Sequence, residues 1–254
     1  MKYIDLNCDM GESFGAWHMG ADAEVMPWVS SINVACGFHA GDPLTMQHTL
    51  EVAARHGVAV GAHIGLPDLV GFGRRAMAIK PDELYAISVA QLGTFEAMAR
   101  TRGLRPGHIK PHGALYHMVE KDDALAQALV QAVSDVDATL RVFGLAGGHL
   151  VRQAAAAGLS TANEAFADRR YLDGGQLQAR GEPGAVLEDI DAAVRQALDI
   201  AVQGQVVSAS GKQLPIDADT VCVHGDRADA AAFAQSLRQG LTEAGVQVRS
   251  PAHT

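Results

Sequence analysis

The chain has 254 residues, of which 48% are hydrophobic and 19% are charged, and its formal net charge is -9. This balance excludes a disordered chain, and an acidic charge with no cluster of lysines and arginines argues against a nucleic-acid partner. No apolar run approaches the roughly 18 residues that a membrane span needs, and the first residues lack the apolar segment of a secretion signal. We therefore expect a cytoplasmic protein with no membrane partner, and the length fits one barrel domain over residues 1–254.

The first predicted strand carries polar residues on one face. Asp5, Asn7 and Asp9 occur at every second position with apolar residues between them, so in a strand their side chains share a face. Glu12 follows just beyond, after a glycine. An edge strand with one solvated face shows the same alternation. The other interpretation, which later strands favour, is one wall of a polar active site.

From residue 42 onward, one pattern repeats: a helix ends at a glycine and a short apolar strand follows. In the first unit Asp42 is a predicted N-cap, Pro43 starts the helix and Gly57 ends it. Such alternation indicates an α/β protein whose parallel sheet is buried on both faces. The predicted helices cover residues 44–56, 81–102, 125–136, 149–157, 186–201 and 229–244. The predicted strands cover residues 2–9, 30–36, 58–64, 107–112, 139–145, 160–166, 220–225 and, as an eighth, 246–249. Residues 205–219 fit a hairpin or insertion.

Histidines and carboxylates stand at the ends of several predicted strands. Beyond the acids of the first strand they include His39, His63, His112, Glu164, His224 and Asp226. In a parallel barrel the carboxyl ends of the strands meet at one rim, so these groups are expected to converge there. Convergent histidines and acids fit either a divalent metal with an activated water or general acid–base catalysis.

Two neighbouring arginines and the cysteines complete the survey. Arg74 and Arg75 could clamp a substrate carboxylate, or could form a solvated loop pair. The chain has no GxxxxGK[ST] motif and therefore no ATP site of the P-loop type. Its three widely spaced cysteines are typical of reduced thiols.

Six stretches of the chain resemble the LamB/YcsF family. They are residues 5–12 (DLNCDMGE), 35–43 (ACGFHAGDP), 71–75 (GFGRR), 110–116 (KPHGALY), 164–169 (EAFADR) and 223–226 (VHGD). The resemblance spans nearly the whole chain, and motifs of this length in this order are specific. It implies a (β/α) barrel with about seven parallel strands, related to glycoside hydrolases and polysaccharide deacetylases.

The resemblance also implies an activity, because the family comprises the A subunit of bacterial ATP-dependent 5-oxoprolinase. We expect ring opening of 5-oxo-L-proline to L-glutamate coupled to ATP hydrolysis, with ATP used through a complex with subunits B and C. Phosphorylating the lactam carbonyl oxygen would make the ring carbon open to attack, and this chain would carry out the hydrolytic half.

Roles can then be assigned to the residues at the strand ends. Asp9 or Glu12 would act as the base on water, Lys110 would face a phosphate or carboxylate, and His112 completes the expected catalytic set. His39, His63 and His112 would hold a divalent metal or the developing oxyanion. The expected substrate-binding residues are Asn7, Arg74, Arg75, Glu164, His224 and Asp226.

Two other functions remain open at this point. One is a stand-alone metal-dependent amidase or deacetylase that needs no ATP. The other is a non-catalytic subunit that binds 5-oxoproline and regulates its partners, although a simple binding pocket would be mostly apolar with few charges.

Overall fold

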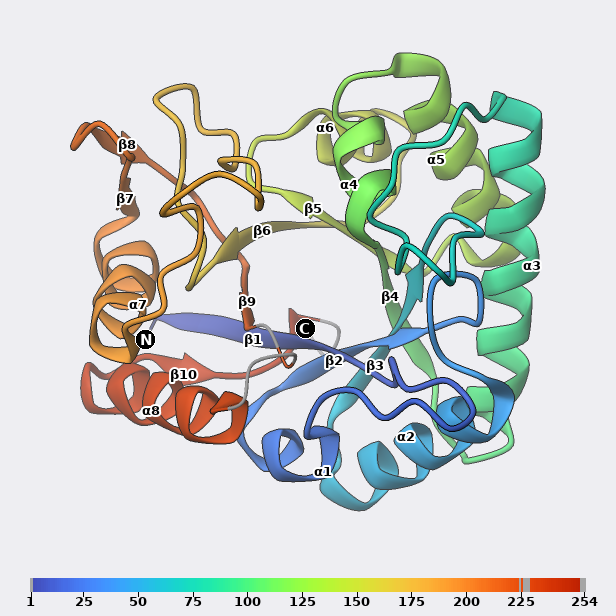
Figure 1. The fold of residues 1–254 in the computed structure, drawn as a ribbon, viewed down its shortest axis with the longest axis horizontal. Coiled ribbons are helices and arrows are strands. Elements are labelled where there is room, and N and C mark those ends of the chain that lie inside the picture. The colour runs from blue at the N-terminus through green and yellow to red at the C-terminus, as the bar shows by residue number, and fades with distance from the viewer. Residues whose placement is uncertain (1, 224, 226–228, 252–254) are drawn as a thin grey trace.

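In the computed structural model, seven parallel strands of the described chain close into a barrel surrounded by helices (Figure 1). The structure describes residues 2–223, 225 and 229–251. The barrel strands are β1 (Tyr3–Met10), β2 (Ser31–Ala35), β3 (Ala59–Ile64), β4 (Pro106–Pro111), β5 (Arg141–Leu145), β6 (Thr161–Phe166) and β9 (Thr220–Val223). They pair in chain order and β9 returns to β1, which closes the ring, while β10 (Gln247–Val248) pairs with β1 from outside. The predicted (β/α) barrel is confirmed.

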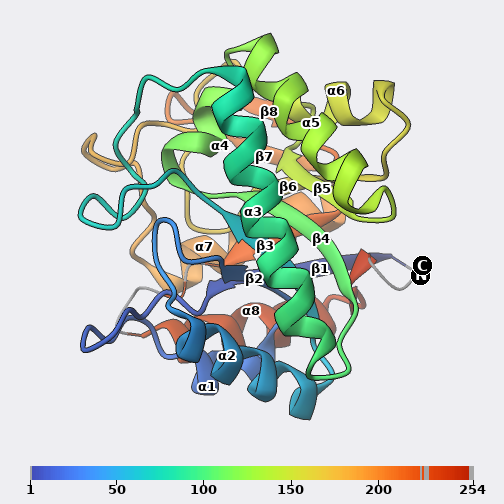
Figure 2. The same ribbon diagram turned by 90° about the vertical axis from the view of Figure 1, so that its right-hand side faces the viewer.

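The helices lie outside this ring and cover the outer faces of the strands (Figure 1). They are α1 (Asp22–Val25), α2 (Pro43–His56), α3 (Pro81–Arg100), α4 (Gly113–Val119), α5 (Asp123–Asp137), α6 (His149–Ala156), α7 (Ile190–Leu198) and α8 (Ala230–Glu243). A 3₁₀ turn (Met26–Trp28) follows α1, and a π-helical turn (Asp199–Gln203) follows α7. The longest helix, α3, packs on β3 and on α5 (Figure 2). No helix in the described part of the chain is long and apolar enough to cross a membrane.

Strand β1 shows how the barrel separates polar from apolar side chains. Ile4, Leu6, Cys8 and Met10 are buried in the hydrophobic core, and the intervening Asp5, Asn7 and Asp9 belong to the opposite face. The strand is flanked by β2 and β9, so the alternative of a solvated edge strand is wrong. The polar face of β1 therefore points into the barrel.

Local signals set the helix boundaries where the sequence predicted them. The Asp42 carboxylate accepts hydrogen bonds from the backbone N–H groups of Leu44 and Thr45, which caps α2. Gly57 ends the same helix with φ 65, a left-handed conformation that favours glycine. Bonds from Gly15 and Thr45 backbone N–H groups hold the pKa of Asp42 down at about 2.

Three details go beyond or correct the sequence expectations. The segment 205–219 forms the antiparallel hairpin β7 (Gln205–Val207) and β8 (Gln213–Pro215), as predicted. The helix expected from residue 186 begins only at Ile190, because Val186 pairs with Arg169 in an isolated bridge and Asp189 caps the helix. The short helix α4 was not predicted, since seven residues are too few to show a clear period.

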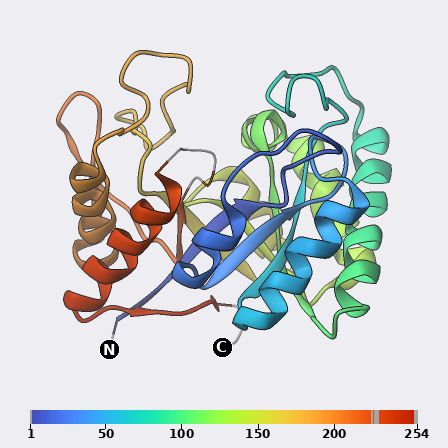
Figure 3. The same cartoon turned by 60° about the horizontal axis from the view of Figure 1, so that its bottom comes forward.

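The loops that follow β1, β3 and β6 rise together at one end of the barrel. Figure 3 shows these loops at the upper edge and the start of β1 at the lower edge. Because all seven barrel strands are parallel, their carboxyl ends share this rim. Side chains at these strand ends are therefore brought together from distant parts of the sequence.

Candidate active site

A cavity of about 640 Å³ lies at the carboxyl ends of the strands. Asp9 and Glu12 line it from β1 and the loop beyond, His63 from β3, and His112 from the residue after β4. Its apolar lining includes Phe166 and Leu177, and its basic lining includes Arg74, Lys110, Lys121, Arg169 and Arg180. The expected convergence of acids and histidines at one rim is thus observed.

Glu12, His39, His63 and His112 form a histidine cluster whose donor atoms all lie within 4.8 Å of one another. Glu12 Oε1 is 3.7 Å from His39 Nε2, 4.0 Å from His63 Nε2 and 3.6 Å from His112 Nδ1. The rings of His39 and His112 stack with centroids 3.8 Å apart. The fold therefore converges one carboxylate and three imidazoles on a single point.

Backbone carbonyls fix the ring protons of two of these histidines. His63 Nδ1 is 3.1 Å from the Lys110 carbonyl oxygen, and His112 Nε2 is 2.8 Å from the Phe72 carbonyl oxygen. A carbonyl can only accept, so each neutral ring carries its proton on that nitrogen. The remaining nitrogens, His63 Nε2 and His112 Nδ1, face each other 2.9 Å apart. Two lone pairs at this distance call for a proton or a cation beside them.

His39 strengthens this interpretation because it is 1% exposed and neither of its ring nitrogens has a hydrogen-bond partner among the described residues. Burial, reinforced by the neighbouring imidazoles, lowers the pKa of His39 well below its ordinary value, and burial does the same for His112. Neutral imidazoles are the form that ligates a metal. The donor set and its spacing fit an ion with bonds of about 2.1 Å.

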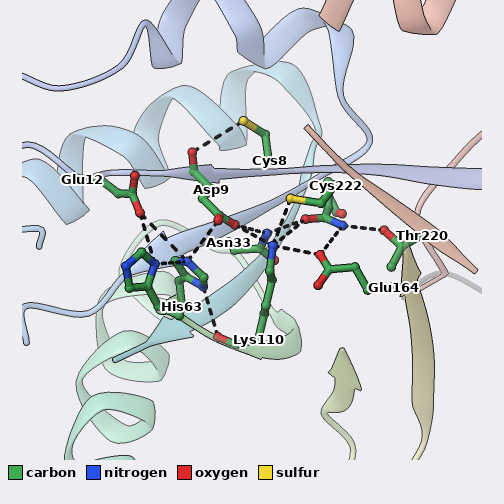
Figure 4. A network of polar contacts seen from close by, with 12 residues as sticks. Cys8, Asp9, Glu12, Asn33, His63, Lys110, Glu164, Thr220 and Cys222 are labelled. Atoms are coloured by element: carbon green, nitrogen blue, oxygen red, sulfur yellow. Dashed lines mark hydrogen bonds and ion pairs between the residues drawn. The ribbon is translucent and has the colours of Figure 1, made fainter. Parts of the chain in front are cut away.

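Asp9 is held beside the cluster by the buried lysine of β4 (Figure 4). Lys110 Nζ donates to Asp9 Oδ1 at 2.9 Å and lies 2.8 Å from Glu164 Oε1. The second Asp9 oxygen, Oδ2, is 3.3 Å from His63 Nε2. Burial lowers the pKa of Lys110, but the neighbouring carboxylates and the Cys222 thiol outweigh it and leave the pKa above its ordinary value. Lys110 is therefore a fixed cation that orients Asp9.

Deeper in the barrel, Asp5, Asn7, Ser31, Asn33 and Thr220 form an interior network of fully buried polar side chains. Asp5 accepts hydrogen bonds from the hydroxyls of Ser31 and Thr220. Asn7 donates to Thr220 and to Glu164, and accepts from Asn33. Even so, burial raises the pKa of Asp5 to about 6. Asn7 and Glu164, expected to bind substrate, are thus parts of or partners to this network and do not line the cavity.

The two arginines of the GFGRR motif separate in the structure. Arg74 lines the cavity, with its guanidinium carbon 4.8 Å above the Phe72 ring. Arg75 pairs with Asp68, and its side chain is 65% exposed on a different surface depression. The structure therefore brings only Arg74 to the candidate site. His224 and Asp226 lie outside the described residues.

Two residues near the site were missed by the sequence analysis. Asn33 donates to Asp9 Oδ1 at 2.8 Å and accepts from His108 Nε2 at 2.8 Å. The His108 ring occupies space left by Gly61, where a Cβ atom would lie 2.2 Å from it. Ser31 and Asn33 alternate as Asp5, Asn7 and Asp9 do, and that spacing could have revealed them.

Comparison with known proteins places this site in a family. The model of the LamB/YcsF family matches residues 4–254. A protein of Tolumonas auensis, named as the A subunit of 5-oxoprolinase, is 50% identical over 250 residues, covering 98% of this chain and 100% of that one. The crystal structure of a lactam utilization protein from Thermus thermophilus is 44% identical with a TM-score of 0.93, covering 97% of this chain and 99% of that one.

A more distant likeness concerns the fold alone. A family 4 carbohydrate esterase from Streptomyces lividans is 11% identical with a TM-score of 0.51, covering 100% of this chain and 95% of that one. This agrees with the expected relation to the deacetylase barrel. The family match and the identity over nearly the full length decide the assignment: the chain belongs to the LamB/YcsF family.

Proposed function

We propose that this chain is the A subunit of an ATP-dependent 5-oxoprolinase and carries out the hydrolytic step that opens the lactam ring of 5-oxo-L-proline to L-glutamate. The observation that carries the proposal is the placement of Asp9 and Glu12 beside two facing, unprotonated imidazole nitrogens at the wall of the cavity. The relatives that carry the name of this 5-oxoprolinase component support the choice of substrate.

The chemistry explains why partners and ATP are needed. Amide resonance makes a lactam a poor electrophile at neutral pH. Phosphorylation of the carbonyl oxygen, which we assign to subunits B and C, weakens that resonance and makes the ring carbon attackable. One water then adds to the carbon, the C–N bond breaks as the nitrogen takes a proton, and a second water releases phosphate from the resulting acyl phosphate.

In this scheme the carboxylates of the site handle protons. Asp9 or Glu12 accepts the proton of the attacking water, since both carboxylates line the cavity. Lys110 and Asn33 hold Asp9 Oδ1, so that Oδ2 remains directed at the histidine cluster. Lys110 thereby acts as a positioning residue, with its charge already balanced by two carboxylates. Arg74 is placed to meet the substrate carboxylate.

We further propose that the histidine cluster binds a divalent metal. Glu12, His39, His63 and His112 would hold it, and the carbonyl bonds of His63 and His112 already present their free nitrogens. When bound, such an ion lowers the pKa of water and polarises a carbonyl oxygen. Nitrogen-rich donor sets suit zinc and related transition metals.

Reconstitution tests the function directly. The purified chain is assayed alone and with its B and C subunits for 5-oxoproline-dependent release of phosphate and glutamate. We expect glutamate only in the complete complex, and we expect Asp9→Asn to reduce its formation at least about a thousandfold. Asp191→Asn, an exposed carboxylate at the start of α7, is the matched control and should keep full activity.

Two results would contradict the proposal. Undiminished turnover in Asp9→Asn would remove the assigned role of that carboxylate. Amide hydrolysis by the isolated chain without nucleotide would favour the stand-alone metal-dependent amidase, to which the histidine cluster and the barrel fold also point.

A further inference from the structure

The cavity is rich in cations although the chain as a whole is acidic. Its net charge is -9, yet the cavity lining contains five basic side chains against the two carboxylates Asp9 and Glu12. These basic residues are Arg74, Lys110, Lys121, Arg169 and Arg180. Lys110 is balanced by Asp9 and Glu164, and Arg74 lies over Phe72. The other three belong to different segments of the rim.

Arg169 is the buried member of this set. It follows β6, which lies across the ring from β3 and its His63. Only 4% of the residue is exposed. Its terminal Nη2 donates to the Gln178 carbonyl oxygen at 2.6 Å, whereas its buried Nε has no hydrogen-bond partner among the described residues. A buried guanidinium N–H of this kind needs an acceptor, and Arg169 lines the cavity.

Like charges gather around Arg169. Burial and the nearby Arg180 guanidinium lower the pKa of Arg169, and Asp168 only partly opposes them. His117 is affected in the same way, because burial, Arg169 and Lys121 all lower its pKa. Positive groups held together at the wall of one cavity repel one another until an anion joins them. This arrangement is typical of an oxyanion-binding site.

We propose that Arg169, Arg180 and Lys121 form an anion subsite that binds the phosphoryl group of the activated substrate, an assignment that rests on the proposed function. A phosphoryl group carries two charges and several acceptor oxygens, which suits three basic side chains better than a single carboxylate does. The cavity volume of about 640 Å³ also leaves room for a ligand larger than the lactam alone. Substrate specificity then depends on the added phosphoryl group as well as on the ring.

Binding of inorganic phosphate to the isolated chain tests this subsite. The chain is treated with a chelator to empty any metal site, and phosphate is titrated by calorimetry at constant ionic strength. We expect one phosphate per chain, with affinity lowered at least about tenfold in R169Q and in R180Q. R180Q changes a half-buried side chain, so it decides the question if R169Q does not fold. R105Q is the matched control, because Arg105 is exposed just before β4, at the opposite end of the barrel.

The outcomes separate this proposal from the proposed function. Absence of phosphate binding, or equal affinity in wild type and R180Q, would overturn the subsite. Competition by 5-oxoproline for the same site would assign it to a carboxylate and also overturn the phosphoryl assignment. Because no partner subunit or turnover is involved, failure of the reconstituted reaction would count only against the proposed function.

Discussion

The interior network and the histidine cluster are both buried, polar and built from the same barrel strands, yet they differ in one property. In the interior network every side-chain oxygen and amide nitrogen has a partner, as Asp5 with its hydroxyl donors illustrates. In the histidine cluster, His39 lacks any hydrogen bond among the described residues, and His63 and His112 turn bare nitrogens toward each other. Burial of polar groups alone therefore does not distinguish a site from a scaffold.

The free energies explain why this difference matters. A buried polar group left without a partner costs about 1–3 kcal/mol, whereas a satisfied network costs little. The interior network is thus complete in the folded chain by itself. The histidine cluster becomes complete when a cation joins it, which is the property expected of a binding site. Three variants, taken from the largest expected effect on stability to the smallest, test the contrast.

Lys110 joins the two regions, so its removal should have the largest effect. Lys110→Met leaves the fully buried Glu164 without its cation, and we expect the free energy of unfolding to fall by about 3–5 kcal/mol. Urea denaturation of both proteins measures the loss. The double variant Lys110→Met/Glu164→Gln serves as the control and should recover much of it. A single variant within about 1 kcal/mol of wild type would show that the lysine is not needed to hold the network.

Asp5 gives the interior network a pH dependence of known sign. Its folded-state pKa is raised by burial to about 6, while in the unfolded chain it titrates near about 3.9. The folded state therefore binds the proton more tightly. The resulting stability, about 3 kcal/mol, is fully present below the unfolded pKa and is lost as the pH rises through about 6.

Asp5→Asn should remove this dependence. The difference in unfolding free energy between wild type and variant, measured by urea denaturation from pH 4 to pH 8, is expected to shift by about 3 kcal/mol in favour of the variant at high pH. Zinc binding by the histidine cluster should stay unchanged in the variant at pH 8. A constant difference across the range would mean that Asp5 is not protonated in the folded state.

The histidine cluster should respond in the opposite way. His39→Leu removes a buried ring that makes no hydrogen bond among the described residues, so the free energy of unfolding of the metal-free chain should change by less than about 1 kcal/mol. Affinity for zinc, measured by calorimetry, should fall at least about a hundredfold. His48→Leu, on the exposed face of α2, is the control and should retain zinc binding. A large loss of stability with zinc affinity intact would make His39 a structural residue.

Much of the fold could be predicted because its signals are local. The cap at Asp42, the stop at Gly57 and the alternation in β1 each depend on a few neighbouring residues, and each is found where the sequence indicated. Val186 shows the limit, since its apolar spacing resembled a helix while its long-range pairing with Arg169 determined its conformation. Pairings between distant segments leave no local trace.

By itself, the sequence determined the order of strands and helices and which residue types stand at the strand ends, because hydrophobic periodicity and capping act over short distances. Only the tertiary structure decided that Arg74 enters the cavity while Arg75 pairs with Asp68, and that Lys110 is neutralised by Asp9 and Glu164. It also decided which nitrogens of His63 and His112 remain free. The physical reason is that barrel closure brings distant strand ends within hydrogen-bonding distance, and the resulting burial and pairing depend on three-dimensional neighbours.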